Sequence, residues 1–305
     1  MTMPEMTMKE MQQKGLETPS EAVYLDCVTD SGDAAFIARL CRYPRAGFAW
    51  VWGHLFVDNH VYAFTDHELP CDDLETNLDQ DPTAYQLSWP NGVVAMHRSG
   101  PRHSPLACNL EGRFMVRDSA HPAHGDGPLE CQVSATFRAS SGAISNRAGR
   151  SEVLGTASIT ARLGDREFSF NGRSQFHEQV QTDPRFTAPF SYLTLRGADL
   201  GVIAIRGSRG ARGHLLGRNE VIEIDRIELT PPGSVRELGL HGRDGSFFAG
   251  GRLRTTYDYS VPVFDGYRPG TLVTGELAGA TVSGCINDFL LDRLHFDRSP
   301  ISGAV

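Results

Sequence analysis

The chain has 305 residues, of which 40% are hydrophobic and 22% are charged, and its formal net charge is −8. This composition is typical of a folded protein with enough apolar mass for two domains, and it excludes global disorder. The negative charge argues against nucleic-acid binding, which needs a basic surface. No apolar run approaches the ~18 residues of a membrane span.

Lysine is almost absent, because only Lys9 and Lys14 occur and every later basic residue is arginine. Schiff-base and pyridoxal chemistry, Walker A loops and protein kinases all require a lysine, so residues 16–305 can form none of these sites. The six cysteines show neither CxxC nor zinc-ligand spacing. We therefore expect a cytoplasmic protein with reduced thiols and no bound metal.

Short strands dominate the predicted structure. The first 18 residues lack the apolar core of a secretory signal and predict a flexible tail. Period-two patterns, β-branched residues or glycine boundaries then indicate strands at 48–57, 60–64, 129–137, 155–162, 166–170, 201–206, 221–229 and 271–282. Only residues 4–14 and 72–80 have helical spacing. Frequent glycine and proline turns between the strands favour an all-β barrel or sandwich.

Two turn-rich stretches, residues 121–128 and 139–150, have the composition of surface loops. We place a domain boundary shortly after them, near residue 165. The expected organisation is a tail at 1–18, one β domain at 19–165 and a second at 166–305.

The first candidate site is the segment 48–64, where Asp58-Asn59 suits a two-residue hairpin turn. One face of its first strand carries four ring side chains: Trp50, Trp52, His54 and Phe56. Aromatic walls with a few polar groups typically line cavities for hydrophobic ligands. We predict that these four residues contact a substrate; the alternative is that they fill a barrel core.

The second candidate site is the segment 171–179, which holds Gln175, His177 and Glu178, with Tyr192 following. Histidine suits proton transfer near neutral pH, so we predict His177, Gln175 and Tyr192 as catalytic residues and Glu178 as a substrate contact. Neighbouring strand residues point to opposite faces, so His177 and Glu178 share one cavity only if the chain bends. A solvated loop histidine is the alternative; in either case, removing His177 is expected to leave folding nearly intact.

Several other patterns do not predict sites. The acidic segment 71–75 resembles a metal–diphosphate motif of helical terpene synthases, but in an all-β chain it indicates a solvated turn. The segment Gly207–Gly213 lies between strands and indicates a hairpin loop rather than a phosphate loop. His121 and His124 lack a third metal ligand. HExxH, GxSxG and dinucleotide motifs are absent from the sequence.

The two candidate segments together resemble a known family. Trp50-Val-Trp-Gly-His-Leu55 with Tyr62-Ala-Phe64 resembles its Trp-Trp-Tyr…Gly-x-Leu opening, and Gly172-Arg-Ser-Gln-Phe-His-Glu178 its second signature, which begins the second domain. The family comprises lipocalin-like carotenoid 1,2-hydratases, attachment-type proteins and the related Diels–Alder cyclases. Gln175 and His177 stand where many members have tryptophan and aspartate. The resemblance implies two tandem lipocalin-like β-barrels or half-barrels, a hydrophobic isoprenoid- or polyketide-type substrate and no organic cofactor.

Two functions are consistent with these observations. The first is a cofactor-independent cyclase, isomerase or hydratase of secondary metabolism that folds a flexible substrate into a reactive conformation. The second is a lipocalin-like carrier that binds such a molecule unchanged. Converging polar groups would favour the enzyme, and an entirely apolar site would favour the carrier.

Overall fold

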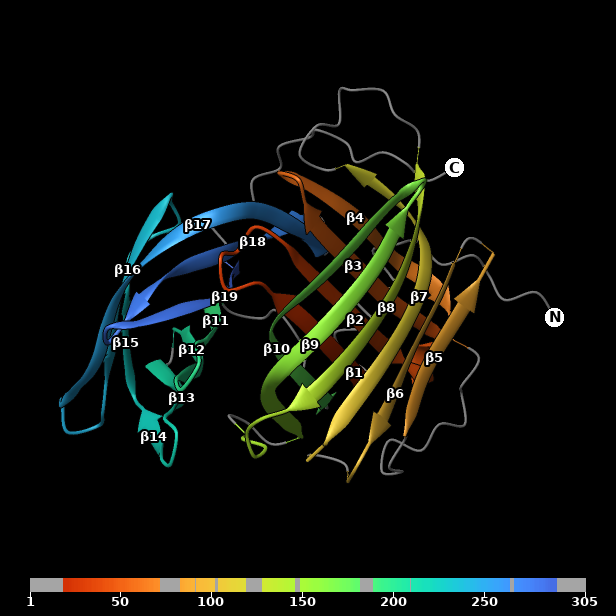
Figure 1. Cartoon of the computed structure of the whole chain (residues 1–305). Coiled ribbons are helices and arrows are strands. Elements are labelled where there is room, and N and C mark those ends of the chain that lie inside the picture. Colours follow the sequence, from red (N-terminus) through yellow and green to blue (C-terminus); the bar gives the residue numbers. More distant parts are fainter. Residues whose placement is uncertain are drawn as a thin grey trace.

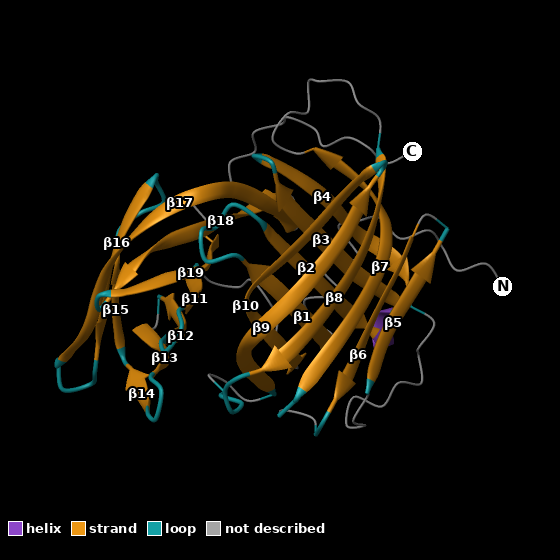
Figure 2. Cartoon of the chain, viewed as in Figure 1, coloured by secondary structure: helices purple, strands orange, loops and turns teal. Residues whose placement is uncertain are grey.

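The computed structural model describes residues 19–71, 83–90, 92–101, 104–118, 128–145, 149–181, 189–208, 210–263 and 266–289. Nearly all of the described chain is β-strand, and one 3-10 turn, Pro44–Ala46, is the purple segment of Figure 2. The all-β prediction is therefore confirmed.

The first half of the chain forms a ten-stranded antiparallel barrel (Figure 1). Its strands are β1 (Ser20–Val28), β2 (Ala35–Tyr43), β3 (Phe48–Val57), β4 (His60–Pro70), β5 (Ala84–Trp89), β6 (Gly92–Ser99), β7 (Ala107–Asp118), β8 (Leu129–Ala139), β9 (Arg150–Leu163) and β10 (Arg166–Gln181). Each strand pairs with the next in sequence except β4 and β5. The first and last strands pair, and β4 pairs with β7 at Tyr62 and Ala63, which nearly closes the barrel.

The second half repeats this arrangement with nine strands. They are β11 (Phe190–Arg196), β12 (Gly201–Gly207), β13 (Gly210–Leu216), β14 (Val221–Ile224), β15 (Arg226–Leu229), β16 (Val235–His241), β17 (Phe247–Val263), β18 (Gly266–Leu277) and β19 (Ala280–Phe289). Only Asp225 separates β14, which pairs with β13, from β15, which pairs with β16. Because β11 also pairs with β19, the nine strands form one curved sheet with β14 and β15 at its edges, and we call this open half-barrel the second barrel.

Two large apolar clusters fill the two barrels, and a third joins them. Alternate residues such as Leu25 on β1 and Phe176 on β10 fill the first barrel, and Leu193 on β11 with Ile286 on β19 help fill the second. The third cluster lies between the barrels and joins the outward faces of β1, β2 and β3 to β17, β18 and β19. We call this inter-barrel region the seam.

Most sequence predictions of strands are confirmed; two predicted strands and the predicted domain boundary need correction. Asp58 and Asn59 have φ of 53° and 63°, as a two-residue hairpin turn requires, and the segment Gly207–Gly213 forms the β12–β13 hairpin. The strands expected at 221–229 and 271–282 are each broken, the second by a turn at Ala278-Gly279.

The third correction concerns the domain boundary. It was expected near residue 165, but β10 continues to Gln181 within the first barrel, so the chain changes barrels between Gln181 and Phe190. The turn Gly164-Asp165 that suggested a boundary only joins β9 to β10. The expected tail at 1–18 and the possible helices at 4–14 and 72–80 lie outside the described residues.

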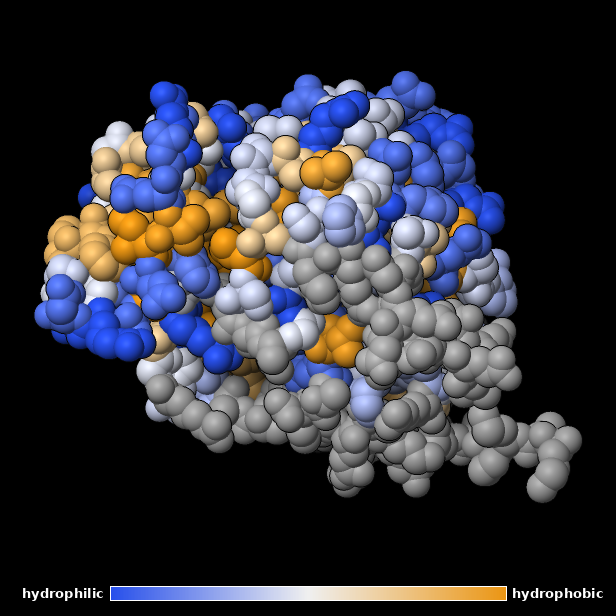
Figure 3. Space-filling view, turned by 90° about the horizontal axis from the view of Figure 1, so that it is seen from below, coloured by the Kyte–Doolittle hydropathy of each residue, from blue (hydrophilic) through white to orange (hydrophobic). Residues whose placement is uncertain are grey.

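The surface differs between the barrels. In Figure 3, the apolar side chains in view gather mainly on the side of the second barrel. Three large apolar residues of that barrel are exposed, Val221, Val235 and Phe247. Within the described residues, no helix has the length and apolarity that crossing a membrane requires.

Candidate active site in the seam between the barrels

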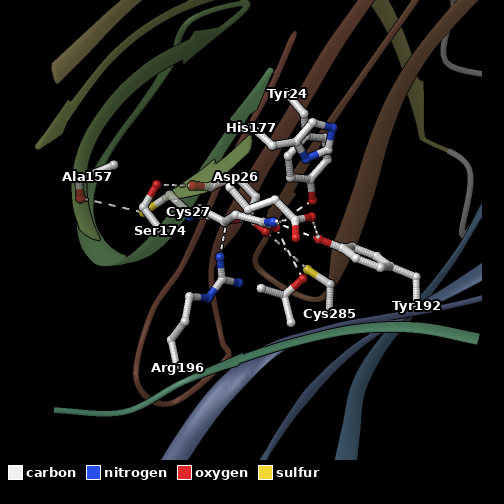
Figure 4. Close-up of polar contacts among 12 residues, drawn as sticks. Tyr24, Asp26, Cys27, Ala157, Ser174, His177, Tyr192, Arg196 and Cys285 are labelled. Atoms are coloured by element: carbon white, nitrogen blue, oxygen red, sulfur yellow. Dashed lines mark hydrogen bonds and ion pairs between the residues drawn. The ribbon is translucent and has the colours of Figure 1, made fainter. Parts of the chain in front are cut away.

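The seam contains a buried polar cluster to which both barrels contribute (Figure 4). Antiparallel register aligns side chains in rows across the first barrel, and one row runs Trp52, Arg39, Tyr24, His177 and Glu152 from β3 to β9. The second barrel presents the alternate residues of β11, which are Tyr192, Thr194 and Arg196, towards this face. Side chains far apart in sequence thus meet because strand alternation aims them at one seam.

Glu152, a fully buried residue, is the centre of the first group of contacts. Its Oε1 accepts hydrogen bonds from the Tyr192 hydroxyl at 2.6 Å and from Arg150 Nε at 2.7 Å. Gln175 Nε2 donates to the Tyr192 oxygen at 2.6 Å, and Thr194 donates to Gln175 Oε1 at 3.1 Å. A carboxylate from the first barrel therefore positions a phenol from the second.

Tyr192 remains a neutral hydrogen-bond donor in this environment. Burial, and then the negative charge of Glu152, raise the pKa of Tyr192 above its ordinary value. The Arg150 guanidinium lies 4.7 Å from the centre of the phenol ring and also pairs with Glu152. Tyr192 is only partly buried, whereas Glu152 is inaccessible, so a substrate would meet the phenol first.

His177 lies beside this group, stacked on a tyrosine. Its ring is parallel to that of Tyr24, with centroids 4.7 Å apart, and its side chain is 2% exposed. Arg150 Nη2 lies 3.4 Å from His177 Nδ1, and because arginine can only donate, Nδ1 is the acceptor. A neutral His177 imidazole therefore carries its proton on Nε2.

The structure corrects the sequence interpretation of His177. It is neither a loop residue nor close to a turn, because it sits inside the sixteen-residue strand β10 and is buried. Removing His177 therefore removes a buried ring and its stacking on Tyr24, so the variant should lose stability, contrary to the sequence prediction.

Asp26 forms a second group of contacts that links the two barrels. Its carboxylate accepts the backbone N–H of Gln175 at 2.8 Å, the Tyr24 hydroxyl at 3.0 Å and the Cys285 thiol at 3.7 Å. It also forms an ion pair with Arg196 of β11. Burial and the carboxylate raise the pKa of both Tyr24 and Cys285, which keeps these donors protonated.

The aromatic residues of β3 form the apolar part of the seam. Trp50, Trp52 and Phe56 share the predicted face, and all are buried between the barrels rather than inside the first. Phe56 makes edge contacts with Tyr257 and Tyr259 of β17, whose centroids lie 5.4 and 5.3 Å away. Gly270 lies beneath the ring of Tyr259, where an added Cβ would come within 2.3 Å.

His54 belongs to the same face and is neutral. Its ring centroid is 5.1 Å from that of Tyr259, and Nε2 lies 3.4 Å from the carbonyl oxygen of Ser260. Burial, assisted by the charge of Arg268, lowers the pKa of His54 to about 4. Since a carbonyl only accepts, Nε2 carries the proton and Nδ1 has the lone pair; Nδ1 has no partner among the described residues.

Glu178 does not join the other candidates. It follows His177 on β10 and points to the opposite face, into the first barrel, where it pairs with Arg98 at 2.6 Å and accepts from Tyr85 at 3.4 Å. The strand does not bend enough to bring the neighbouring side chains together. Its predicted role in substrate contact therefore has no geometric support from the seam.

Sequence reasoning missed much of the cluster. Glu152, Arg150, Tyr24, Asp26 and Arg196 were not singled out, because each lies on an ordinary alternating strand. Only the excess of polar residues on one face of β1 and β10 could have signalled them. Among the described residues, no group of three or more His, Cys, Asp or Glu could hold a metal ion. All six cysteines lie within the described residues, and they are buried thiols that form no disulfide.

Comparison with known proteins supports the fold. No protein-family model and no curated protein sequence matches the chain. Among solved structures, a protein described as AttH from Nitrosomonas europaea is 10% identical, with a TM-score of 0.60 over 94% of this chain and 98% of that one. Kievitone hydratase from Nectria haematococca is 10% identical, with a TM-score of 0.54 over 92% and 91% of the two chains.

A third similar structure is CghA, which is 12% identical, with a TM-score of 0.51 over 89% of this chain and 88% of that one. It has also been solved with Sch210972. At such low identity these similarities concern the fold, and they extend over almost the whole chain. The protein therefore has the tandem lipocalin-like fold that its resemblance to the hydratase, attachment-protein and cyclase family implies.

Proposed function

We propose that this protein is a cofactor-independent enzyme that cyclises, isomerises or hydrates a hydrophobic small molecule held in the seam. The observation that carries the proposal is the meeting of Tyr192 from one barrel with Glu152 and Gln175 from the other. A carrier needs only an apolar site, whereas this seam combines aromatic walls with aligned polar groups. The fold shared with kievitone hydratase supports the same class of function.

The chemistry follows from orientation and hydrogen bonding. The seam would hold a flexible substrate in a reactive conformation, which can lower a barrier by several kcal/mol. The hydroxyl of Tyr192, held in place by Glu152 and Gln175, would turn its single proton from Glu152 to a substrate oxygen that gains negative charge during the reaction. Trp52 and Phe56 offer π faces that can stabilise a developing positive charge.

The proposal is tested by conversion of a natural substrate. The protein is incubated with small-molecule extract of the producing cell, and bound and converted species are followed by mass spectrometry. A product of unchanged mass indicates cyclisation or isomerisation, and a gain of one water indicates hydration. Retention of a compound without any conversion would contradict the enzyme and support the carrier.

A pair of matched variants then assigns the donor. Tyr192→Phe removes one hydroxyl bonded to a glutamate in the seam and should reduce turnover by about 10²–10⁴-fold. Tyr85→Phe makes the same chemical change at Glu178, inside the first barrel, and should leave turnover unchanged. Equal turnover in the two variants would exclude Tyr192 as the donor.

A further inference from the structure

Arg196 presents an unused hydrogen-bonding edge in the seam. Its side chain is 2% exposed, and only Nη1 is bonded, to Asp26. Nε and Nη2 have no hydrogen-bond partner among the described residues. Burying unpaired donors of a charged group is costly, so this arrangement calls for a ligand.

The two unused donors are the ones that bind a carboxylate side-on. In a guanidinium, the Nε–H and Nη2–H bonds run parallel, and together they match the two oxygens of a carboxylate. Asp26 does not occupy this edge. Asp26 also receives three other hydrogen bonds, from Gln175, Tyr24 and Cys285, so it does not depend on Arg196 alone.

Ser283 supplies a second, independent unpaired group at the same place. It lies on β19 directly opposite Arg196 in the strand register, on the same outward face, and is 1% exposed. Its hydroxyl has no partner within the described part of the chain. A ligand oxygen beside Arg196 would therefore meet a hydroxyl donor as well.

We propose that Arg196 and Ser283 form a subsite for a carboxylate, or an equivalent planar pair of acceptor oxygens, on the substrate. The inference rests on the proposed function, because Arg196 lies on the same outward row of β11 as Thr194 and Tyr192. It narrows the substrate to a molecule with a carboxylate or such a pair of oxygens, and it excludes a pure hydrocarbon. A site built to bond such a group discriminates strongly against analogues that lack it.

The test uses isothermal titration of the full chain with 2-naphthoate and its methyl ester, which share one apolar body. The wild-type protein should bind 2-naphthoate roughly 10- to 100-fold more tightly, as expected for a hydrogen-bonded charge pair. Arg196→Lys keeps a cation beside Asp26 but loses the parallel donors, so it should remove the preference and leave the affinity for the ester unchanged.

The matched control is Arg236→Lys in the interior of the second barrel. All three guanidinium nitrogens of Arg236 are bonded, to Asp288 and to the carbonyl of Thr230, so the variant should keep the preference. Equal affinity of the wild-type protein for both probes, including no binding of either, would overturn the subsite. So would an unchanged preference in Arg196→Lys.

A second variant keeps the test valid if Arg196→Lys fails to fold. Ser283→Asp places a carboxylate of the chain itself beside the unused edge, so it should raise Tm by a few degrees and abolish 2-naphthoate binding. Undiminished binding would overturn the proposal. These measurements need no turnover, so failure of the subsite is distinct from failure of the enzyme, which is judged by conversion of extract components.

Discussion

Acidification should lower the unfolding free energy of the protein, because His54 in the seam is buried and neutral. This imidazole is buried with a pKa of about 4, against 6.5 for an unperturbed histidine. Below pH 6.5 the unfolded chain takes up a proton that folded His54 does not accept until about pH 4, so stability falls as the pH drops through this window. The full difference corresponds to about 3 kcal/mol of unfolding free energy.

The measurement compares urea unfolding of the wild-type protein and His54→Phe at pH 7.5 and pH 4.5. Phenylalanine keeps the ring contacts with Phe56 and Tyr259 but cannot be protonated. Between pH 7.5 and pH 4.5 the variant should therefore lose about 2.5 kcal/mol less unfolding free energy than the wild type. His97→Phe, at an exposed position on β6, is the control and should follow the wild type. Parallel pH profiles for wild type and His54→Phe would refute the assignment of a buried neutral histidine.

Three further predictions follow from the seam. Asp26→Ala leaves the buried Arg196 without its anion, so the unfolding free energy should fall by about 3–5 kcal/mol in urea titrations; a loss below 1 kcal/mol would mean that the pair does not join the barrels. Trp52→Ala should lower stability by roughly 3–5 kcal/mol and also weaken ligand binding, measured by titration; unchanged binding would assign Trp52 to core filling alone. Turnover should survive exhaustive EDTA treatment, and its loss with recovery on adding zinc or magnesium would contradict a metal-independent reaction.

The sequence identified the elements near the site more reliably than the site itself. Alternation along β3 and the Asp58-Asn59 turn were enough to place Trp50, Trp52, His54 and Phe56 on one face, because the side-chain period of a strand is fixed by backbone geometry. The same rule indicated that His177 and Glu178 would separate unless the chain bent, and in the structure they do separate. These are local consequences of the chain, so one sequence suffices to obtain them.

The seam itself could not be obtained in this way. Both faces of β3 are apolar, and alternation alone does not show which of them lies inside a barrel and which is an outer face covered by a second barrel. The boundary was misplaced for a similar reason: the turn after Leu163 and the later change of barrel both fall between strands, and only strand pairing shows which sheet β10 joins.

The polar residues of the candidate site are brought together only by the tertiary structure. Glu152 and Tyr192 lie forty positions apart, and Asp26 and Arg196 a hundred and seventy, so no local spacing links them. In each half of the chain the first strand pairs with the last, which sets β1 beside β10 and β11 beside β19. The sequence by itself determined strands, faces and the exclusion of lysine chemistry. The packing of the two curved sheets against each other decided which outward faces meet, because burial between them depends on contacts that neither strand pattern contains.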